Sequence, residues 1–434
     1  MRDDDARRGG LDRRAFLRRA AWTGGALAVG LPALAGCTRN RVVKIGYLTS
    51  ASGARAGFGE SAAWNVARVR ALLKSGLRVG GRTFPVEILM RDTQSMTGRA
   101  AEAGSDLLLH DGIDLLLADD GDSHYAVGEL CDRIGVPFIS TLTPWEPFLY
   151  ARHSSPDRGF PWCFLFCVGA HDIAVNYVAQ WNRLATNRVV GDLYLDRPSG
   201  HAFADTETGV PAELDKYAFR RVAAGFYPPE ADDFSSQIAA FKAADVQILS
   251  GLLFPSQFTR LWAEAERQGF RPEVCTVAAA FLFPEGVQAL GERGDGMSTE
   301  VWWTPKVPFT SSLTGETAQT VAAQWEASTG KQWTQPIGYV HALFEVAIEV
   351  LKRSGDPRDR TAVRAAIANL SLDTLVGSVN FRDSPIRSVA ATEMAMGQWR
   401  RQARGKFPFE LLITSNSTAP HIVPEAEMKL LSLI

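Results

Sequence analysis

Short apolar runs alternate with longer amphipathic segments along most of the chain. The first run covers residues 42–47, small residues interrupt it at 50–59, and an amphipathic segment follows at 62–73. Apolar runs of about four to eight residues are typical of buried strands, and longer segments with apolar positions three and four apart are typical of helices. The pattern predicts a strand, a loop of small residues and a helix, which form half of a βαβ unit.

The same alternation recurs through the rest of the chain. Further strands are predicted at residues 86–90, 113–118, 136–140, 164–168, 188–196, 217–221, 246–254, 273–281 and 297–303. Helices are predicted at residues 98–110, 125–134, 234–244, 258–268, 315–329, 337–355 and 361–370, and another is predicted to start near Asp172 as its N-cap. Because the apolar runs are continuous, we expect strands covered on both faces, and hence parallel sheets in an α/β fold.

A segment rich in proline and charge, residues 144–161, separates two series of these units. We expect the chain to cross from one lobe to the other in the strand and helix start that follow, residues 164–174, and to cross again at residues 297–303. Hydrophobic residues make up 46% of the chain and charged residues 22%, with a formal net charge of −2. This composition is ordinary for a soluble globular protein. Since a broad nucleic-acid surface needs a basic excess, we expect no nucleic-acid partner.

The first residues have the pattern of an export signal. Arg13 and Arg14 precede Phe-Leu, a weakly apolar run covers residues 20–35, and Leu-Ala-Gly-Cys ends at Cys37. A generic basic leader would explain the arginine pair alone, but the pair and the box at this spacing predict a twin-arginine lipoprotein signal peptide over residues 1–36. We expect lipidation at Cys37, a tether at 37–41, and an exported protein held on a membrane at the periplasm or cell surface by its lipid anchor only.

Four cysteines follow the leader: Cys131, Cys163, Cys167 and Cys275. The envelope is oxidising, so disulfides are allowed. Positions four apart on an extended strand are about 13 Å apart, which is too far for a bridge between Cys163 and Cys167. A bridge from Cys131 to Cys163 stays possible, but buried free thiols are the favoured interpretation. The C-x₃-C spacing has no histidine or acidic cluster beside it, so no metal site is predicted.

Small and polar residues follow several of the predicted strands. In open α/β sheets, ligands bind beyond the carboxyl ends of the strands. The loop after the first strand therefore supplies candidate ligand contacts, and acidic residues at 119–122 follow a later strand. The acidic run is also consistent with a solvated turn that caps the next helix, and hydroxyl residues at 140–143 are also consistent with caps.

The order of the motifs resembles a known family. The runs IGYLTSASGARAGFGE (45–60), Arg91-Asp92, IGVPFISTLTPWEP (134–147) and DRPSGHAF (196–203) are similar to those of extracellular solute-binding proteins of the leucine/isoleucine/valine-binding family, the type I periplasmic binding proteins of ABC importers. Residues 232–251, 299–316 and 331–347 look like a branch associated with branched-chain amino-acid transport. The resemblance covers essentially residues 42–400.

The resemblance implies two doubly wound parallel-sheet α/β lobes joined by three crossing strands. It places lobe 1 at residues 42–165 and 303–372, and lobe 2 at residues 166–302 and 373–434 with the C-terminal tail. Such lobes close on a ligand like a hinged trap. The implied partners are a small-molecule ligand and ABC permease subunits, and we expect a monomer without a cofactor.

The resemblance also implies a set of ligand contacts. Relatives hold an amino acid with a serine after the fourth strand and with a small residue and a threonine after the fifth. These positions match Ser123 and residues 141–143, although Leu142 is bulkier than the family pattern. Ser199 stands where relatives often have an aromatic residue, and alanines at 278–280 stand where amino-acid binders have an acidic residue. Together with the strand-end candidates, the predicted ligand-binding residues are Ser52, Ala56, Phe58, Asp122, Ser123, Ser140, Thr141, Thr143, Trp145, Ser199, Phe254, Phe281 and Trp302.

The function predicted from the sequence is capture of a small polar solute by the binding lipoprotein of an ABC importer. The solute is a branched-chain amino acid, an amide or a urea-like compound, and the missing acidic residue argues against a standard α-amino acid. No enzyme is predicted, since the sequence has no G-x-S-x-G, H-E-x-x-H or G-x-x-x-x-G-K motif. The alternative is a ligand sensor of the same fold, which neighbouring genes would distinguish from an importer component.

Overall fold

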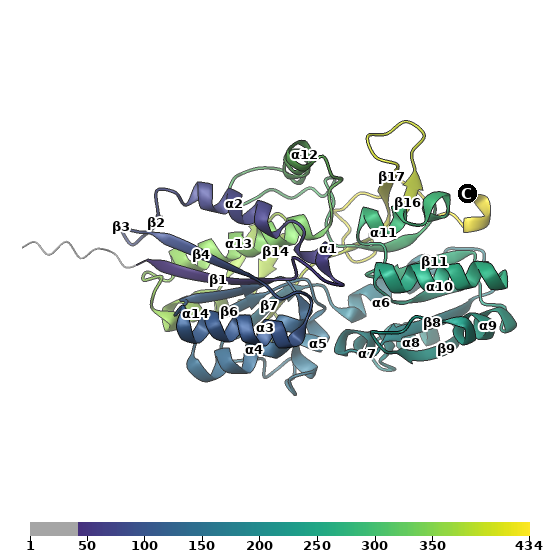
Figure 1. The fold of residues 1–434 in the computed structure, drawn as a ribbon, viewed down its shortest axis with the longest axis horizontal. Coiled ribbons are helices and arrows are strands. Elements are labelled where there is room, and N and C mark those ends of the chain that lie inside the picture. The colour runs from purple at the N-terminus through teal and green to yellow at the C-terminus, as the bar shows by residue number, and fades with distance from the viewer. Residues whose placement is uncertain (1–41) are drawn as a thin grey trace, which may run out of the picture. The chain divides into compact units, whose positions relative to one another are not determined.

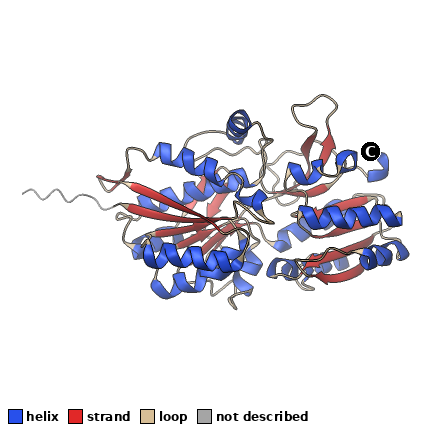
Figure 2. Cartoon of the chain, in the orientation of Figure 1, coloured by secondary structure: helices blue, strands red, loops and turns tan. Residues whose placement is uncertain are grey.

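The computed structural model describes residues 42–434, which lie within one compact unit, residues 40–434. Within this unit the strands form two larger sheets, and helices cover both faces of each sheet (Figures 1 and 2). We call the six-stranded sheet with its helices lobe 1 and the seven-stranded sheet with its helices lobe 2. The expected signal peptide, lipidation site and tether lie outside the described residues.

Lobe 1 is built on a parallel sheet with the strand order β15-β7-β6-β5-β1-β4. Its strands are β1 (Val43–Thr49), β4 (Val86–Asp92), β5 (Leu115–Ala118), β6 (Phe138–Ser140), β7 (Cys163–Cys167) and β15 (Val389–Ala391). Two hairpins accompany it, β2 (Leu77–Val79) with β3 (Arg82–Phe84), and β13 (Ser371–Thr374) with β14 (Gly377–Asn380). Its helices are α1 (Ala56–Gly59), α2 (Ala62–Leu72), α3 (Thr97–Ser105), the π-helix η1 (Asp106–His110), α4 (Gly121–Ile134), α5 (Trp145–Tyr150), α12 (Ala318–Thr329), α13 (Pro336–Arg353) and α14 (Arg360–Ala368).

Lobe 2 is built on a mixed sheet with the strand order β17-β16-β12-β11-β10-β8-β9. The strands β8 (Val189–Leu195), β9 (Arg220–Tyr227), β10 (Ile248–Leu252), β11 (Val274–Ala278) and β12 (Ser298–Val301) are parallel, and β16 (Ala395–Arg401) and β17 (Phe409–Ser415) complete it as antiparallel strands. Its helices are α6 (Ala170–Trp181), α7 (Pro198–Ala204), α8 (Val210–Lys216), α9 (Ser235–Ala243), α10 (Pro255–Gln268), α11 (Pro284–Gln288) and the short 3₁₀ turns η2 (Gly291–Gly294) and η3 (Leu431–Leu433).

The core follows the apolar pattern. β5 and β7 are buried along their whole length, as strands covered on both faces must be. The long helix α13 starts with proline at its first turn, where a missing N–H costs nothing, and it packs on α2, β5 and β6 with almost every residue buried. Because all strands of the lobe 1 sheet are parallel, the loops that follow their carboxyl ends lie at one edge of the sheet. The predicted α/β fold class is confirmed.

One local prediction was wrong, and two other segments differ from the pattern in detail. Asp172 is not an N-cap but the third residue of α6, where its carboxylate accepts a hydrogen bond of 2.9 Å from the backbone N–H of Gly169. Part of the proline-rich segment forms α5 in spite of its proline. The strand predicted at 217–221 is β9, which starts at Arg220 and continues to Tyr227. Local hydrogen bonding thus accounts for the position of Asp172 in the first turn of α6.

The chain passes between the lobes three times: after β7, after β12, and between β15 and β16. The first two passages follow residues 167 and 301, close to the expected lobe limits of 165 and 302. Because β15 pairs with β7, the third passage follows Ala391, later along the chain than the expected limit of 372.

The four cysteines of the described chain are buried free thiols, as predicted. Burial raises the pKa of all four, so they stay protonated and unreactive at neutral pH. Among residues 42–434, no helix combines the length and the apolar composition that a membrane span requires.

Candidate ligand-binding site

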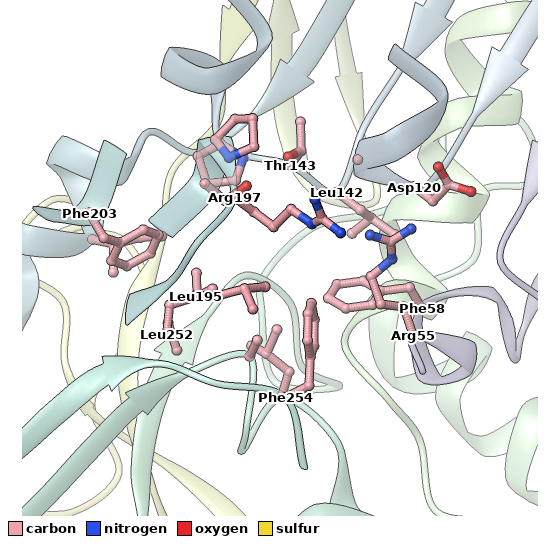
Figure 3. A pocket seen from close by; sticks show the side chains of 18 of the residues that line it. Arg55, Phe58, Asp120, Leu142, Thr143, Leu195, Arg197, Phe203, Leu252 and Phe254 are labelled. Atoms are coloured by element: carbon pink, nitrogen blue, oxygen red, sulfur yellow. The ribbon is translucent and has the colours of Figure 1, made fainter. Parts of the chain in front are cut away.

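A cavity of about 90 Å³ lies where the carboxyl ends of strands from both lobes meet (Figure 3). Lobe 1 lines it with residues of α1 and of the loops that follow β5 and β6. Lobe 2 lines it with residues that follow β8, β10 and β11, and with β12 and its extension. The position is the one expected for a ligand site in parallel sheets, because free N–H groups of helix starts and side chains of short loops converge there.

Most of the wall is apolar. Phe58 of α1 contacts two rings of lobe 2 edge to face, Phe254 with centroids 6.5 Å apart and Phe283 with centroids 5.0 Å apart. Edge-to-face pairs of this kind stabilise contacts by about 0.5–1.5 kcal/mol beyond burial. Leu195, Phe203 and Leu252 extend the apolar surface on the lobe 2 side (Figure 3). The cavity therefore fits an apolar body rather than a compact polar molecule.

Asp120 supplies a fixed carboxylate on the lobe 1 wall. It caps α4 by accepting a 2.8 Å hydrogen bond from the backbone N–H of Ser123. Its other oxygen accepts from the hydroxyls of Ser50, at 2.9 Å, and Thr93, at 2.7 Å. The carboxylate is thus committed to its own lobe and is held in one orientation.

The neighbouring Asp119 points away from the cavity into the sheet. The hydroxyls of Tyr47 and Thr49 donate to it, and burial raises the pKa of Asp119 well above its ordinary value. Adjacent residues of the acidic run therefore differ in role: Asp120 lines the cavity and caps α4, whereas Asp119 accepts hydrogen bonds inside lobe 1. The side chain of Asp122 lies outside the described part of the structure, so its predicted contact stays a prediction.

Glu300 and Trp302 face the cavity from the lobe 2 side. Glu300 is fully buried and accepts hydrogen bonds from the hydroxyls of Tyr177, at 2.5 Å, and Thr299, at 2.9 Å. Burial raises the pKa of this carboxyl group. The indole N–H of Trp302 is buried and has no hydrogen-bond partner among residues 42–434, so it is a donor that a bound acceptor would satisfy.

Two guanidinium groups reach the cavity from opposite lobes. Arg55 precedes α1 in lobe 1, and Arg197 precedes α7 in lobe 2. Figure 3 shows both side chains directed into the pocket. No side chain or backbone oxygen of the described residues forms a hydrogen bond or ion pair with the guanidinium of Arg197. A planar guanidinium with free donors is suited to a bidentate contact with a carboxylate.

Strained backbone accompanies the cavity in both lobes. Leu142, after β6, has φ of 61°, and Ala279, after β11, has φ of 64°. Both are non-glycine residues in the left-handed region, which costs of order 1 kcal/mol or more each. Each residue sits in the turn that leaves a strand end and lines the cavity. Such strain commonly concentrates at ligand sites, where the surrounding structure fixes a turn that a relaxed chain would avoid.

The structure brings some of the predicted site residues together. Five of them line the cavity: Phe58, Thr143, Ser199, Phe254 and Trp302. Their ligand contact stays a prediction, but their convergence from two lobes is a structural fact.

The other predicted residues lie elsewhere. Ser140 and Thr141 donate their hydroxyl hydrogen bonds to carbonyls of β7, and the exposed Ser52 donates to Asp92. Ser123 is buried in α4, and Phe281 packs in the core of lobe 2 against Phe258. Ala56 and Trp145 are partly buried and are not part of the cavity wall.

The sequence patterns missed several lining residues, including Arg55, Tyr125, Arg197 and Glu300. A signal existed for Glu300, since it lies two positions before Trp302 within the strand predicted at residues 297–303 and would face the same side of that strand. Arg197 lies two positions before Ser199 in the loop already singled out. Neither arginine could be assigned from sequence alone, because loop side chains have no periodicity to orient them.

The sequence of residues 42–406 matches the family described as Periplasmic binding protein. No curated protein sequence is similar enough to this chain to be matched.

Solved structures share the fold at low sequence identity. The leucine-binding protein LivK from Thermotoga maritima has 14% identity and a TM-score of 0.69, over 86% of this chain and 99% of that one. An ABC transporter solute-binding protein from Rhodopseudomonas palustris in complex with 3,4-dihydroxybenzoic acid has 13% identity and a TM-score of 0.68, over 87% and 99% of the two chains.

A third similar structure is the branched-chain amino acid transporter binding protein LivJ from Streptococcus pneumoniae in complex with isoleucine. It has 15% identity and a TM-score of 0.64, over 86% of this chain and 99% of that one. The resemblance drawn from the motifs is thus confirmed for family and fold. Because the family match covers most of its length, this chain belongs to the periplasmic binding protein family and has the type I fold of that family.

Proposed function

We propose that this protein is the substrate-binding lipoprotein of an ABC importer. In this proposal its cavity captures a small solute that has an apolar body and a carboxylate. Of the ligand classes expected from the sequence, a branched-chain amino acid or a related apolar acid fits the wall better than urea or a small amide. Three solved structures of similar fold support this class: a leucine-binding protein, a complex with isoleucine and a complex with 3,4-dihydroxybenzoic acid.

The observation that carries the proposal is the pairing of Arg197 with an apolar wall made by both lobes. A charge-assisted hydrogen bond to a carboxylate contributes about 1.5–3 kcal/mol. Burial of a branched aliphatic or aromatic side chain against Phe58 and Phe254 contributes roughly a further 1.5–3 kcal/mol. Asp120 and Glu300 accept hydrogen bonds within their own lobes, and neither forms an ion pair with Arg197.

Capture is an equilibrium shift rather than a reaction. A solute that contacts Thr143 on one lobe and Arg197 on the other binds the closed arrangement better than an open one, and so shifts the population toward closure. No bond is made or broken in this process. A binding free energy near −8 kcal/mol would correspond to roughly micromolar capture. In the proposal, permease subunits then receive the closed form at faces of both lobes.

Anchoring is the second part of the proposal. Cys37 carries the lipid and the short tether that follows links it to β1, which starts at Val43. The support is the leader sequence, with its arginine pair and its Leu-Ala-Gly-Cys box. Fractionation of cells tests it: the protein should accompany the membrane, and the Cys37→Ser variant should lose the acyl mass on intact-protein mass spectrometry. An unmodified wild-type cysteine would contradict lipidation.

Isothermal titration calorimetry against a panel of solutes tests the ligand class. The panel contains leucine, isoleucine, branched-chain 2-oxo acids, aromatic carboxylates, small amides and urea. We expect heat with one or more apolar carboxylates and none with urea. Heat with urea or amides but with no carboxylate would contradict the proposed class, and a panel with no heat at all would contradict capture of a small solute.

A further inference from the structure

A second pocket, of about 750 Å³, lies at the amino-terminal edge of the lobe 1 sheet, away from the strand ends that line the interlobe cavity. Loops before β7 and β15 and the helix α14 line it. Its wall contains five arginines and no acidic residue: Arg152, Arg158, Arg364, Arg382 and Arg387. We propose that this arginine pocket binds a phosphate group, carried either by an anionic phospholipid headgroup or by soluble phosphate.

Hydrogen bonds join the two loops of the pocket, which precede β7 and β15, so the pocket is formed without a ligand. The backbone N–H of Arg387 donates to the carbonyl of Pro156 at 2.6 Å. The hydroxyl of Ser388 accepts from the N–H of Phe160 at 2.9 Å and donates to the carbonyl of the same residue at 3.0 Å. Gly159 has φ of 58°, and a Cβ there would lie 2.6 Å from the Ser388 hydroxyl. The loops thus hold the arginines in place without a ligand.

Two of the arginines form ion pairs with carboxylates of the chain, one buried and one exposed. The side chain of Arg152 is 7% exposed, pairs with Asp132 at 2.7 Å and lies 3.9 Å from the ring centre of Phe160. Arg382 pairs with Asp383 at 3.0 Å. They shape the pocket and supply no net charge to a ligand.

The other three arginines are not neutralised. No carboxylate of the described residues lies within ion-pair distance of Arg158, Arg364 or Arg387. Arg364 donates to the carbonyl of Pro161, which leaves its charge in place. The nearest acid on the loop is the exposed Asp157, whose pKa is lowered mainly by a hydrogen bond from Ser155 and less by Arg158 and Arg387. Three like charges around one hollow, in a chain of net charge −2, favour an anion there.

Phosphate matches this arrangement better than a single carboxylate does. Guanidinium groups bind phosphate oxygens in bidentate pairs, and a phosphate offers oxygens to several arginines at once. The pocket has room for more than a bare ion, and its floor includes the rings of Phe164 and Phe381, which contact each other edge to face at 5.6 Å. A headgroup with a glycerol or acyl stem would cover this apolar floor.

The position of the pocket fits a membrane source. β1 starts at Val43 at the same edge of the sheet, since all six strands are parallel. β7 is the third strand from β1, a separation of about 15 Å. Residues 38–42 span at most about 18 Å. If Cys37 carries the lipid proposed above, headgroup phosphates lie within reach of the arginine pocket. The phosphate site itself does not depend on that lipid.

Vesicle sedimentation and calorimetry test the proposal with a chain that starts at residue 38. This chain keeps the whole compact unit and lacks the lipidation cysteine. The vesicles are phosphatidylcholine alone or an equimolar mixture with phosphatidylglycerol, and inorganic phosphate is titrated separately. The test variant is Arg158→Gln/Arg364→Gln/Arg387→Gln. The matched control is Arg99→Gln/Arg267→Gln/Arg401→Gln, which removes the same charge from exposed sites elsewhere.

We expect the unmodified chain to bind the phosphatidylglycerol vesicles, and the test variant to bind them roughly a hundred-fold more weakly, at about 1 kcal/mol per arginine near the surface. The control should change by less than about threefold. If the protein binds the phosphatidylglycerol vesicles but not inorganic phosphate, the ligand is a lipid headgroup. If it binds inorganic phosphate but not the vesicles, the ligand is soluble phosphate. Equal losses in both variants, or no binding of either probe, would overturn the proposal. Thermal melting of both variants, and calorimetry with the panel solute that binds the interlobe cavity, verify that both variants fold.

Discussion

The interlobe cavity and the arginine pocket lie at opposite edges of one parallel sheet and differ in almost every property. The cavity is made by two lobes, is mostly apolar, and contains carboxylates as well as guanidinium groups. The arginine pocket is made by lobe 1 alone and contains guanidinium groups without an acid. The carboxyl edge thus encloses a small molecule, whereas the amino edge offers charge to a larger or surface-bound anion.

The difference shows how each edge treats its charged groups. At the carboxyl edge, hydroxyls and backbone N–H groups fix Asp120 and Glu300, so that closure of the lobes does not bury unpartnered carboxylates. At the amino edge, Arg158 and Arg387 remain exposed to solvent. Solvent stabilises these charges until an anion arrives, which is consistent with reversible surface contact.

The largest expected effect is loss of solute binding in the Arg197→Ala variant. Because the variant loses a charge-assisted hydrogen bond, its affinity for the carboxylate that binds most tightly in the panel should fall by about 10- to 150-fold. The matched change at the other edge, Arg387→Ala, should leave this affinity within about twofold. Calorimetry with both variants measures the difference. Equal affinities in the two variants would mean that the carboxylate lies elsewhere.

Ionic strength should separate the two sites next. Contacts between exposed charges weaken as the Debye length falls from about 10 Å at 0.1 M salt to about 3 Å at 1 M. We expect vesicle or phosphate binding at the arginine pocket to fall more than about tenfold across this range. Solute binding in the enclosed cavity should fall by less than about threefold. Salt titrations of both binding reactions compare the two sites. A larger loss of affinity at the interlobe cavity than at the arginine pocket would contradict the view that the cavity is the enclosed site.

The Gly159→Ala variant should loosen the amino edge alone. A Cβ at this position meets the Ser388 hydroxyl and the Arg387 carbonyl, at 2.6 and 2.8 Å, in addition to the strain of its positive φ. The control is Gly112→Ala, which has φ of 64° and open space around its Cβ. We expect the free energy of unfolding to fall by about 1–3 kcal/mol for Gly159→Ala, and by less for the control.

Denaturant titration measures these stabilities, and phosphate binding should weaken only in Gly159→Ala. Equal stability losses in the two variants would show that φ strain, rather than the fastened loops, sets the effect.

The smallest expected effect is a pH dependence at the carboxyl edge. Glu146 of α5 accepts hydrogen bonds from the backbone N–H groups of Ala170, at 2.6 Å, and His171, at 2.9 Å, and burial raises its pKa to about 6. The folded state therefore binds more protons than the unfolded state between the ordinary value of 4.5 and about 6. Stability from this group falls as the pH rises through that window, by at most about 2 kcal/mol.

The Glu146→Gln variant should lack this dependence, so its stability relative to the unmodified chain should improve from pH 4.5 to pH 6 and then level. Denaturant titrations at several pH values measure it. A constant difference between the two proteins across the window would contradict the raised pKa.

The sequence predicted the fold better than the site, for physical reasons. Strands such as β5 carry continuous apolar runs, which report burial on both faces directly. Site side chains depend on loop geometry instead. The predicted hydroxyls of Ser140 and Thr141 lie at the right edge, yet they hydrogen-bond to β7 rather than face the cavity. Strand periodicity would have found Glu300 from Trp302, but no local pattern orients Arg197.

The arginine pocket could not be predicted from the sequence for a different reason. Its residues come from three segments, at 152–164, at α14 and at 381–388, which are distant along the chain. The pairing of β15 with β7 brings the first and last of these segments together, and Arg364 of α14 contacts the first through the carbonyl of Pro161. The third lobe passage has the same origin, since a short strand of three residues gives a weak signal and its partner lies more than two hundred residues away.

Crystallography of the protein with its tightest panel solute tests the central claim most directly, namely that both lobes share one ligand. Density should fill the cavity, with the carboxylate on Arg197 and the apolar part against Phe58 and Phe254, within contact distance of Thr143. A solute bound wholly to one lobe, or an empty cavity beside an occupied site elsewhere, would contradict the account.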